Sequence, residues 1–210
     1  MGNIGFLGRK DWLFWGVRCL GKVLLSPFFR IDTQGEENLP RNSPFVLLPK
    51  HQRWEDIPIL GIATPNPLYY VAKYELFTNP LGSWFLKSLG GIPLNRNRPL
   101  ESRRSIRAMI EFLREGEGVV VFPEGTYYRG RMGPGHVGMI RLILSRLTLP
   151  FIPLGINYSK KGFRTFVRLR FGKPFHADPT AYPNSFLEQM MRQIAELSAL
   201  AQGPTQASGR

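Results

Sequence analysis

Apolar residues along this chain fall into short runs and into stretches with helical spacing. The short runs, rich in Val, Ile, Leu, Phe and Tyr, predict strands at residues 45–48, 68–72, 91–95, 118–122, 151–158 and 164–171. Helical patterns lie between most of them. Because strands that alternate with helices favour layers of helix around a sheet, the sequence predicts a single α/β domain with a central mixed sheet flanked by helices.

Three segments carry the helical spacing most clearly. Residues 101–115 repeat apolar side chains with the period of a helix, and residues 139–147 do so until Pro150 stops them. Near the C-terminus, Ser185 and Glu188 form a capping-box pattern ahead of an apolar stripe. This pattern predicts that Ser185 caps the last helix.

The two ends of the chain differ from its middle in composition. Residues 1–35 combine Trp and Phe with Arg and Lys, which predicts a helical membrane-associating segment. Residues 203–210 are small and polar and predict a disordered tail. Residues 36–202 would form the α/β domain, and the polar, turn-rich residues 32–44 would be a connection.

The N-terminal segment has no clean signal-peptide order and is a poor membrane span, because Arg18 and Lys22 interrupt its apolar run. These two cations lie one helical turn apart and share a face of a helix. An amphipathic interfacial helix fits the pattern, with aromatic side chains at the acyl boundary and cations at lipid phosphates. A helix packed on the core is the alternative.

The chain is basic, with 28 Lys and Arg against 15 Asp and Glu in 210 residues. This excess suits an anionic membrane surface, an acidic substrate or a polyanion. Nucleic acid is not an expected partner, since the basic residues are scattered among apolar segments and no recognition motif occurs. The single Cys19 excludes an internal disulfide and a cysteine-based zinc site, and fits a reducing compartment.

The segment KHQRWED, residues 50–56, places a histidine near two adjacent acids. On a regular helix His51 and Asp56 would lie about 140° apart, so their side chains could not meet. If they act together, the chain must turn between them. His51 would then lie in a loop after the strand at 45–48, and Asp56 in or near the first turn of the next helix.

A histidine held by a carboxylate can take a proton from a hydroxyl, which then attacks an acyl carbon. No serine or cysteine intermediate is needed if the substrate supplies the alcohol and the acyl donor is activated, as a thioester is. A metal site of His51, Asp56 and Glu124 is the alternative, although His136 and His176 lack ligand spacing to His51. We expect no metal.

The strand at 118–122 runs into the loop Pro-Glu-Gly-Thr, residues 123–126. Loops at the carboxyl ends of strands in α/β sheets bind ligands, and Gly125 would let a ligand approach the backbone. Glu124 could orient a hydroxyl or a cation, and a simple turn is the alternative. Residues 133–138 spell G-x-G-x-x-G but lack the strand before and the acid after, so nucleotide binding is not expected.

Four blocks follow one another along the chain: His-x4-Asp at 51–56, a glycine-led apolar run ending in Arg at 90–96, Phe-Pro-Glu-Gly-Thr at 122–126, and an apolar strand with a central Pro at 151–156. In this order they resemble the glycerolipid acyltransferases of the 1-acylglycerol-3-phosphate (lysophosphatidic acid) acyltransferase family. A Lys-x-Glu-Leu segment at 73–76 lies between the first two. One block alone is weak, but four in order and register across residues 43–175 are specific.

The resemblance implies an enzyme that moves a fatty acyl group from acyl-CoA or acyl-acyl carrier protein to the free hydroxyl of a lysophospholipid. With 1-acyl-glycerol-3-phosphate as acceptor, the product would be phosphatidic acid. By resemblance, His51 is the base that deprotonates the acceptor hydroxyl and Asp56 orients it. Arg96 would bind the acceptor phosphate. The residues lining the acceptor site would be Lys73, Glu124, Gly125 and Thr126.

The resemblance further implies no metal or other cofactor, membrane lipids as partners, and a location on the cytoplasmic face of the membrane. A different class of protein, a catalytically inactive membrane lipid-binding protein, should lack the histidine and the acid of the first block. Both His51 and Asp56 are present.

Three positions depart from the family pattern: Lys50 where Asn is common, Arg53 where a small residue is common, and Tyr127 where Arg usually follows Thr. They leave the acceptor open, which could be another lysolipid or a different hydroxyl or amine. Lys50 and Arg53 could lower the pKa of the proposed base or help to hold an anionic substrate.

Overall fold

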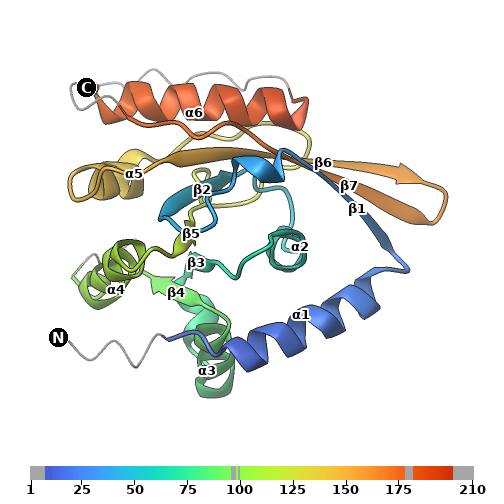
Figure 1. Ribbon diagram of the computed structural model, residues 1–210, viewed down its shortest axis with the longest axis horizontal. Coiled ribbons are helices and arrows are strands. Elements are labelled where there is room, and N and C mark those ends of the chain that lie inside the picture. The colour runs from blue at the N-terminus through green and yellow to red at the C-terminus, as the bar shows by residue number, and fades with distance from the viewer. Residues whose placement is uncertain (1–7, 96–97, 99, 178–181, 201–210) are drawn as a thin grey trace.

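The computed structural model describes residues 8–95, 98, 100–177 and 182–200 of the chain. Within them, seven strands form one sheet in the order β1-β7-β6-β2-β5-β3-β4 (Figure 1). The strands are β1 Phe29–Gln34, β2 Phe45–Pro49, β3 Tyr69–Lys73, β4 Gly91–Leu94, β5 Gly118–Val120, β6 Phe151–Lys161 and β7 Arg164–Phe171. Only the β6–β7 pair is antiparallel among the paired strands, so the predicted mixed sheet is confirmed.

Six α-helices and two short 3-10 turns connect these strands in the described residues. The helices are α1 Asp11–Leu25, α2 Asp56–Ala63, α3 Pro80–Ser88, α4 Arg103–Arg114, α5 Val137–Leu144 and α6 Pro183–Ser198, and the 3-10 turns are η1 Glu36–Asn38 and η2 Tyr74–Phe77. Every strand and helix that the apolar patterns predict is present, within a few residues of its predicted ends.

The central strands are apolar at every position because both faces of the sheet are covered. In β2, Val46 and Leu48 pack into one core with α4, α5 and α6, whereas Phe45 and Leu47 pack into a second core with α2. Successive side chains of a strand point to opposite faces. A continuous apolar run therefore places β2 at the centre of the sheet, and its carboxyl end leads directly into KHQRWED.

Strand β1 is the element that the sequence patterns miss. Residues 32–34 were predicted to lie in a connection, but Phe29–Gln34 pairs in parallel with β7 at the edge of the sheet. Its side chains alternate between partly buried and exposed, because an edge strand covered on one face keeps polar residues on the other. The segment 1–35, predicted to lie outside the domain, thus contributes a strand to its sheet.

The last helix begins earlier than the capping-box pattern predicts. Helix α6 begins at Pro183, and the Oγ of Ser185 donates to the carbonyl of Tyr182 at 2.8 Å. Proline is well suited to the first helical position, where a backbone N–H would have no intrahelical partner. The capping prediction for Ser185 is therefore wrong. The predicted tail at residues 203–210 lies outside the described residues.

Helix α1 packs on α2 and still leaves most of its apolar side chains exposed. Arg18 donates to the carbonyl oxygens of Ile62, at 3.0 Å, and Pro65, at 3.3 Å, and Phe14 is the one buried residue of the helix. Its exposed large apolar residues are Trp12, Trp15, Leu20, Val23 and Leu24. No helix in the described part of the chain is long and apolar enough to cross a membrane. The alternative of a helix packed on the domain is therefore confirmed in part, with Arg18 bonded to the carbonyl of Ile62 in α2. The membrane-associating role of this segment stays a prediction.

We predict that substituting Gly155 by Ala destabilises the fold, because a Cβ there would overlap the backbone of Leu197 in α6. Overpacking of this kind costs about 1–3 kcal/mol. Gly138, in α5, is the matched control, since a Cβ there meets nothing within 4 Å. Denaturant-induced unfolding should show a loss for Gly155→Ala and none for Gly138→Ala. Equal stability of the two variants would contradict the packing described for α6.

Candidate active site

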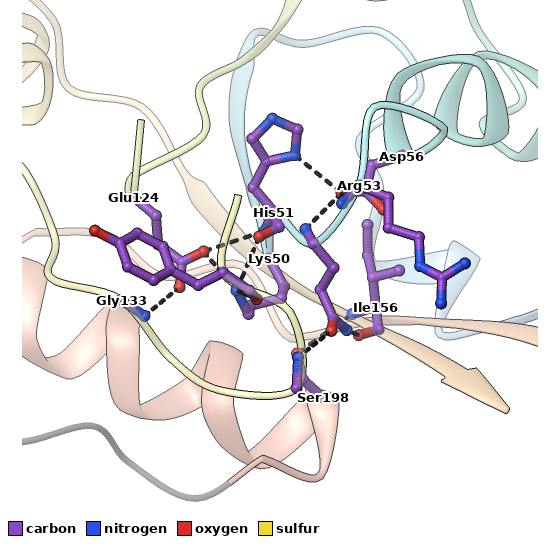
Figure 2. A network of polar contacts seen from close by, with 11 residues as sticks. Lys50, His51, Arg53, Asp56, Glu124, Gly133, Ile156 and Ser198 are labelled. Carbon is purple, nitrogen blue, oxygen red and sulfur yellow. Dashed lines mark hydrogen bonds and ion pairs between the residues drawn. The ribbon is translucent and has the colours of Figure 1, made fainter. Parts of the chain in front are cut away.

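KHQRWED folds as a loop followed by the first turn of a helix, as its geometry requires. Strand β2 ends at Pro49, the chain turns at residues 54–55, and α2 begins at Asp56. Figure 2 shows the ring of His51 turned toward Asp56, with 2.9 Å between Nδ1 and Oδ2. The predicted pairing of these two side chains across a strand-to-helix turn is present.

The Asp56 carboxylate is fully buried and accepts four hydrogen bonds. Besides His51, Oδ2 accepts from the backbone N–H groups of Gln52, at 2.6 Å, and Arg53, at 2.8 Å. Oδ1 accepts from the hydroxyl of Tyr158 in β6 at 2.5 Å. Burial first, and then the charge of Asp56, raises the pKa of Tyr158, so this hydroxyl stays a donor.

Because an ionised carboxylate can only accept, Nδ1 of His51 must donate to Asp56. The neutral imidazole then carries its free lone pair on Nε2, which has no hydrogen-bond partner among the described residues. The ring stacks on Phe122 with 4.0 Å between centroids, and the Tyr127 ring meets it edge-on at 4.7 Å. The site therefore presents a fixed proton acceptor between two aromatic side chains.

Lys50 points into the protein rather than toward a substrate. Its ammonium group is fully buried and donates to Oε2 of Glu124, at 2.6 Å, and to the carbonyls of His51 and Tyr128, at 2.9 and 2.8 Å (Figure 2). Oε1 of Glu124 accepts from the backbone of Gly133 at 2.8 Å. Burial lowers the pKa of Lys50, and the bond to Glu124 opposes that shift.

This buried ion pair ties the loop after β2 to the loop after β5. The backbone N–H of His51 also faces Glu124 Oε2, at 3.4 Å, and the N–H of Tyr128 donates to the His51 carbonyl at 3.0 Å. Glu124, expected to orient a hydroxyl or a cation, thus binds a cation of the protein itself. The position of His51 is held from both sides, by Asp56 and by Glu124 with Lys50.

A cavity of about 270 Å³ lies beside this pair. It brings together four of the residues predicted to line an acceptor site, Lys73, Glu124, Gly125 and Thr126, with Glu75, Leu94 and His136. Gly125 adopts a φ of 67°, which glycine allows without strain. His51 does not line the cavity, but its backbone N–H faces Glu124, which does. Arg96 lies outside the described residues.

The sequence patterns do not predict the contact of Tyr158 with Asp56, the position of Arg53 beside the Tyr158 ring, or the partial burial of Glu55. Tyr158 ends the apolar part of β6, at residues 151–158. Only the order of strands in the sheet brings β6 beside β2 and the Tyr158 hydroxyl to Asp56. The guanidinium of Arg53 lies 4.5 Å from the centre of the Tyr158 ring. Glu55, the acid next to Asp56 in KHQRWED, is partly buried, and its Oε2 has no hydrogen-bond partner within the part of the chain described.

The alternative of a metal site formed by His51, Asp56 and Glu124 has no matching cluster of side chains in the described residues. Within the described ranges, no group of three or more His, Cys, Asp or Glu residues comes close enough to hold an ion. His136 lines the cavity, and His176 is exposed at a distance in sequence from every block of the site.

Comparison with known proteins places this site in a family. The acyltransferase family model matches residues 30–157, which include His51, Asp56 and the loop after β5. A 1-acyl-sn-glycerol-3-phosphate acyltransferase of Bacillus subtilis (strain 168) is 33% identical over 190 residues, covering 84% of this chain and 92% of the relative. The chain belongs to the 1-acylglycerol-3-phosphate acyltransferase family. It is an acyltransferase, and the resemblance of the four blocks is confirmed.

Two further proteins resemble this acyltransferase, one in fold and one in sequence. The crystal structure of a 1-acyl-sn-glycerophosphate acyltransferase, PlsC, from Thermotoga maritima has the same fold, with a TM-score of 0.68 at 23% identity over 92% of this chain and 83% of that one. A lyso-ornithine lipid O-acyltransferase of Pseudomonas aeruginosa is 28% identical over 134 residues, or 64% of this chain and 50% of that protein. Relatives therefore differ in the acceptor that their names give.

We predict that Lys50→Met destabilises the protein by about 3–5 kcal/mol, because it leaves the carboxylate of Glu124 buried without its counter-charge. Exchanging both partners, in Lys50→Met with Glu124→Gln, should cost less than the single change, since no charge is then left unpaired. Unfolding in denaturant measures both. A single variant as stable as the unaltered protein would contradict the pairing.

Proposed function

We propose that this acyltransferase moves a fatty acyl group from an acyl thioester to the free hydroxyl of a lysophospholipid, with 1-acyl-glycerol-3-phosphate as acceptor and phosphatidic acid as product. The observation that carries the proposal is the His51–Asp56 pair, in which a buried carboxylate holds Nδ1 and leaves Nε2 unpartnered among the described residues. Such a histidine is built to take a proton from a hydroxyl.

In the proposed reaction, Nε2 of His51 removes the proton of the acceptor hydroxyl while the hydroxyl oxygen attacks the carbonyl carbon of the thioester. A carbon–oxygen bond forms, the carbon–sulfur bond breaks, and the thiolate leaves with the proton that His51 took. Asp56 stabilises the imidazolium that forms in between. The thioester is a co-substrate, either acyl-CoA or acyl-acyl carrier protein, and the reaction requires no metal or other cofactor.

The acceptor would bind in the cavity beside Glu124. Lys73, which is exposed, supplies a cation to its lining, and Gly125 and Thr126 line it as well. We propose that Arg96, the Arg of the second family block, binds the acceptor phosphate. The names of relatives support a lysophosphatidic acid acceptor, and one relative named for a lyso-ornithine lipid supports the alternative that another lysolipid is used.

We propose that the protein works at the cytoplasmic face of a membrane, attached through α1. Exposed Trp12 and Trp15, followed by exposed Val23 and Leu24, suit the interface between headgroups and acyl chains. Lys22 is exposed on the same helix and suits lipid phosphates. Membrane lipids would then be both the partner of α1 and the source of the acceptor.

His51→Ala should lower the rate of acyl transfer from a thioester to lysophosphatidic acid by about 100-fold to 10,000-fold, because the general base is lost. His176→Ala is the matched control and should keep full activity. His176 is exposed and follows Phe175, which pairs with Phe151 at the start of β6, whereas the site lies beyond the end of β2. Release of free thiol measures both. Full activity of His51→Ala would reject the general-base role.

Arg96→Ala should raise the KM for lysophosphatidic acid by about tenfold or more and change kcat less, because it removes a charge-assisted bond to the phosphate. Arg98→Ala is the control, since exposed Arg98 is paired with Glu101 at 2.9 Å. A panel with lysophosphatidylcholine and a lyso-ornithine lipid compares acceptors. An unchanged KM would reject the proposed binding of the phosphate by Arg96. Faster transfer to another lysolipid would show that this lysolipid, and not lysophosphatidic acid, is the preferred acceptor.

A further inference from the structure

Strands β6 and β7 extend past the covered part of the sheet and end in an exposed turn. Residues 159–164, called here the hairpin tip, are all exposed, and Figure 1 shows the hairpin projecting at one end of the molecule. Gly162, with a φ of 61°, makes the turn. Beside it, Phe163 is 81% exposed, and among the described residues no large apolar side chain is more exposed. The hairpin tip therefore presents an aromatic side chain to the solvent.

The hairpin tip that carries Phe163 is basic and contains no acidic residue. The hairpin tip carries Lys160, Lys161 and Arg164, and none of the three forms a salt bridge with any described residue. Arg164 lies 5.6 Å from the centre of the Phe163 ring, and Lys161 lies 5.3 Å from that of Phe166. An isolated exposed aromatic side chain is ordinary. An exposed aromatic side chain on a turn that also carries three cations without salt bridges to described residues fits a partner surface with an apolar interior and anionic groups at its edge.

The hairpin tip also adjoins the end of α1. The Nε of Arg164 donates to the carbonyl of Pro27 at 3.2 Å, and the N–H of Thr165 donates to the carbonyl of Phe28 at 2.8 Å. Phe28 is exposed, as is Leu24 in the last turn of α1. The exposed apolar side chains of the helix thus continue through Phe28 toward the hairpin. Figure 1 shows the end of α1 and the hairpin at the same end of the molecule.

We propose that the hairpin tip is a second contact with an anionic lipid bilayer, in which Phe163 enters the interface and Lys160, Lys161 and Arg164 bind anionic headgroups. A helix lying in a bilayer surface can roll about its own axis, and a contact on a separate element removes that freedom. The inference rests on the membrane association proposed for α1. Its chemistry is that of interfacial aromatic residues and of basic clusters on anionic lipids.

A bilayer accounts for these features better than an acidic carrier protein. Cations alone would suit either partner. The adjoining apolar side chains belong to two elements, the hairpin and α1, and extend along a helix of 15 residues, about 22 Å long. An extended surface of that kind, with cations beside it, matches the headgroup and acyl boundary of a bilayer.

The test is co-sedimentation of the full chain with vesicles of phosphatidylcholine, with and without phosphatidylglycerol. Each cation near an anionic surface strengthens binding about fivefold. Lys160→Ser with Lys161→Ser should therefore weaken binding to the anionic vesicles about 25-fold and change binding to neutral ones little. Phe163→Ser should weaken binding to both, because its contact is apolar.

The matched control is Arg104→Ser with Arg107→Ser, which removes two exposed cations from α4, at the opposite end of the molecule in Figure 1. This control variant should bind both kinds of vesicle with an affinity within about twofold of that of the unaltered protein. Thermal unfolding of each variant should match the unaltered protein, since all the altered side chains are exposed.

Hairpin variants that bind both kinds of vesicle as the unaltered protein does would overturn the inference. Unchanged vesicle binding with a loss of transfer from acyl-acyl carrier protein alone would also overturn it, in favour of carrier docking. Binding is measured without turnover, so the two proposals fail separately. A chain that binds through the hairpin but transfers no acyl group would overturn only the proposed function.

Discussion

The arrangement of the active site depends on one buried carboxylate. Asp56 has no exposed surface, and a charge in that position is tolerated only when hydrogen bonds replace its water. Two of its donors are the backbone N–H groups of Gln52 and Arg53, so the loop must curl around the carboxylate. A third is the ring of His51, and the fourth, Tyr158, comes from another strand. Satisfying this one charge orients the proposed base.

The second constraint is the Lys50–Glu124 pair, which acts on the other side of His51. Removing two charges from water is expensive, and the cost is offset only where each has further bonds. Lys50 bonds two carbonyls besides Glu124, and Glu124 bonds Gly133 besides Lys50. The pair thereby connects the loop after β2, which carries the proposed base, to the loop that lines the cavity. This explains how a lysine can stand where the family often has asparagine without facing the substrate.

Local patterns in the sequence predict much of this structure. The apolar runs locate six of the strands, and helix geometry requires a turn between His51 and Asp56 if the two residues act together. The missing parts depend on contacts between distant segments. The order of strands in the sheet determines three of these contacts. It pairs β1 with β7, brings Tyr158 to Asp56, and places Glu124 where Lys50 must point inward to reach it. No spacing within one segment encodes that order.

The proposed function requires that His51 holds its proton on Nδ1 and keeps Nε2 open to the acceptor hydroxyl. Nitrogen-15 NMR of the imidazole, assigned by comparison with His51→Ala, tests this at a pH where the ring is neutral. The hydrogen bond to Asp56 predicts a protonated Nδ1 and an unprotonated Nε2. A neutral ring with its proton on Nε2 would contradict the account, because that nitrogen could not accept the proton of a substrate.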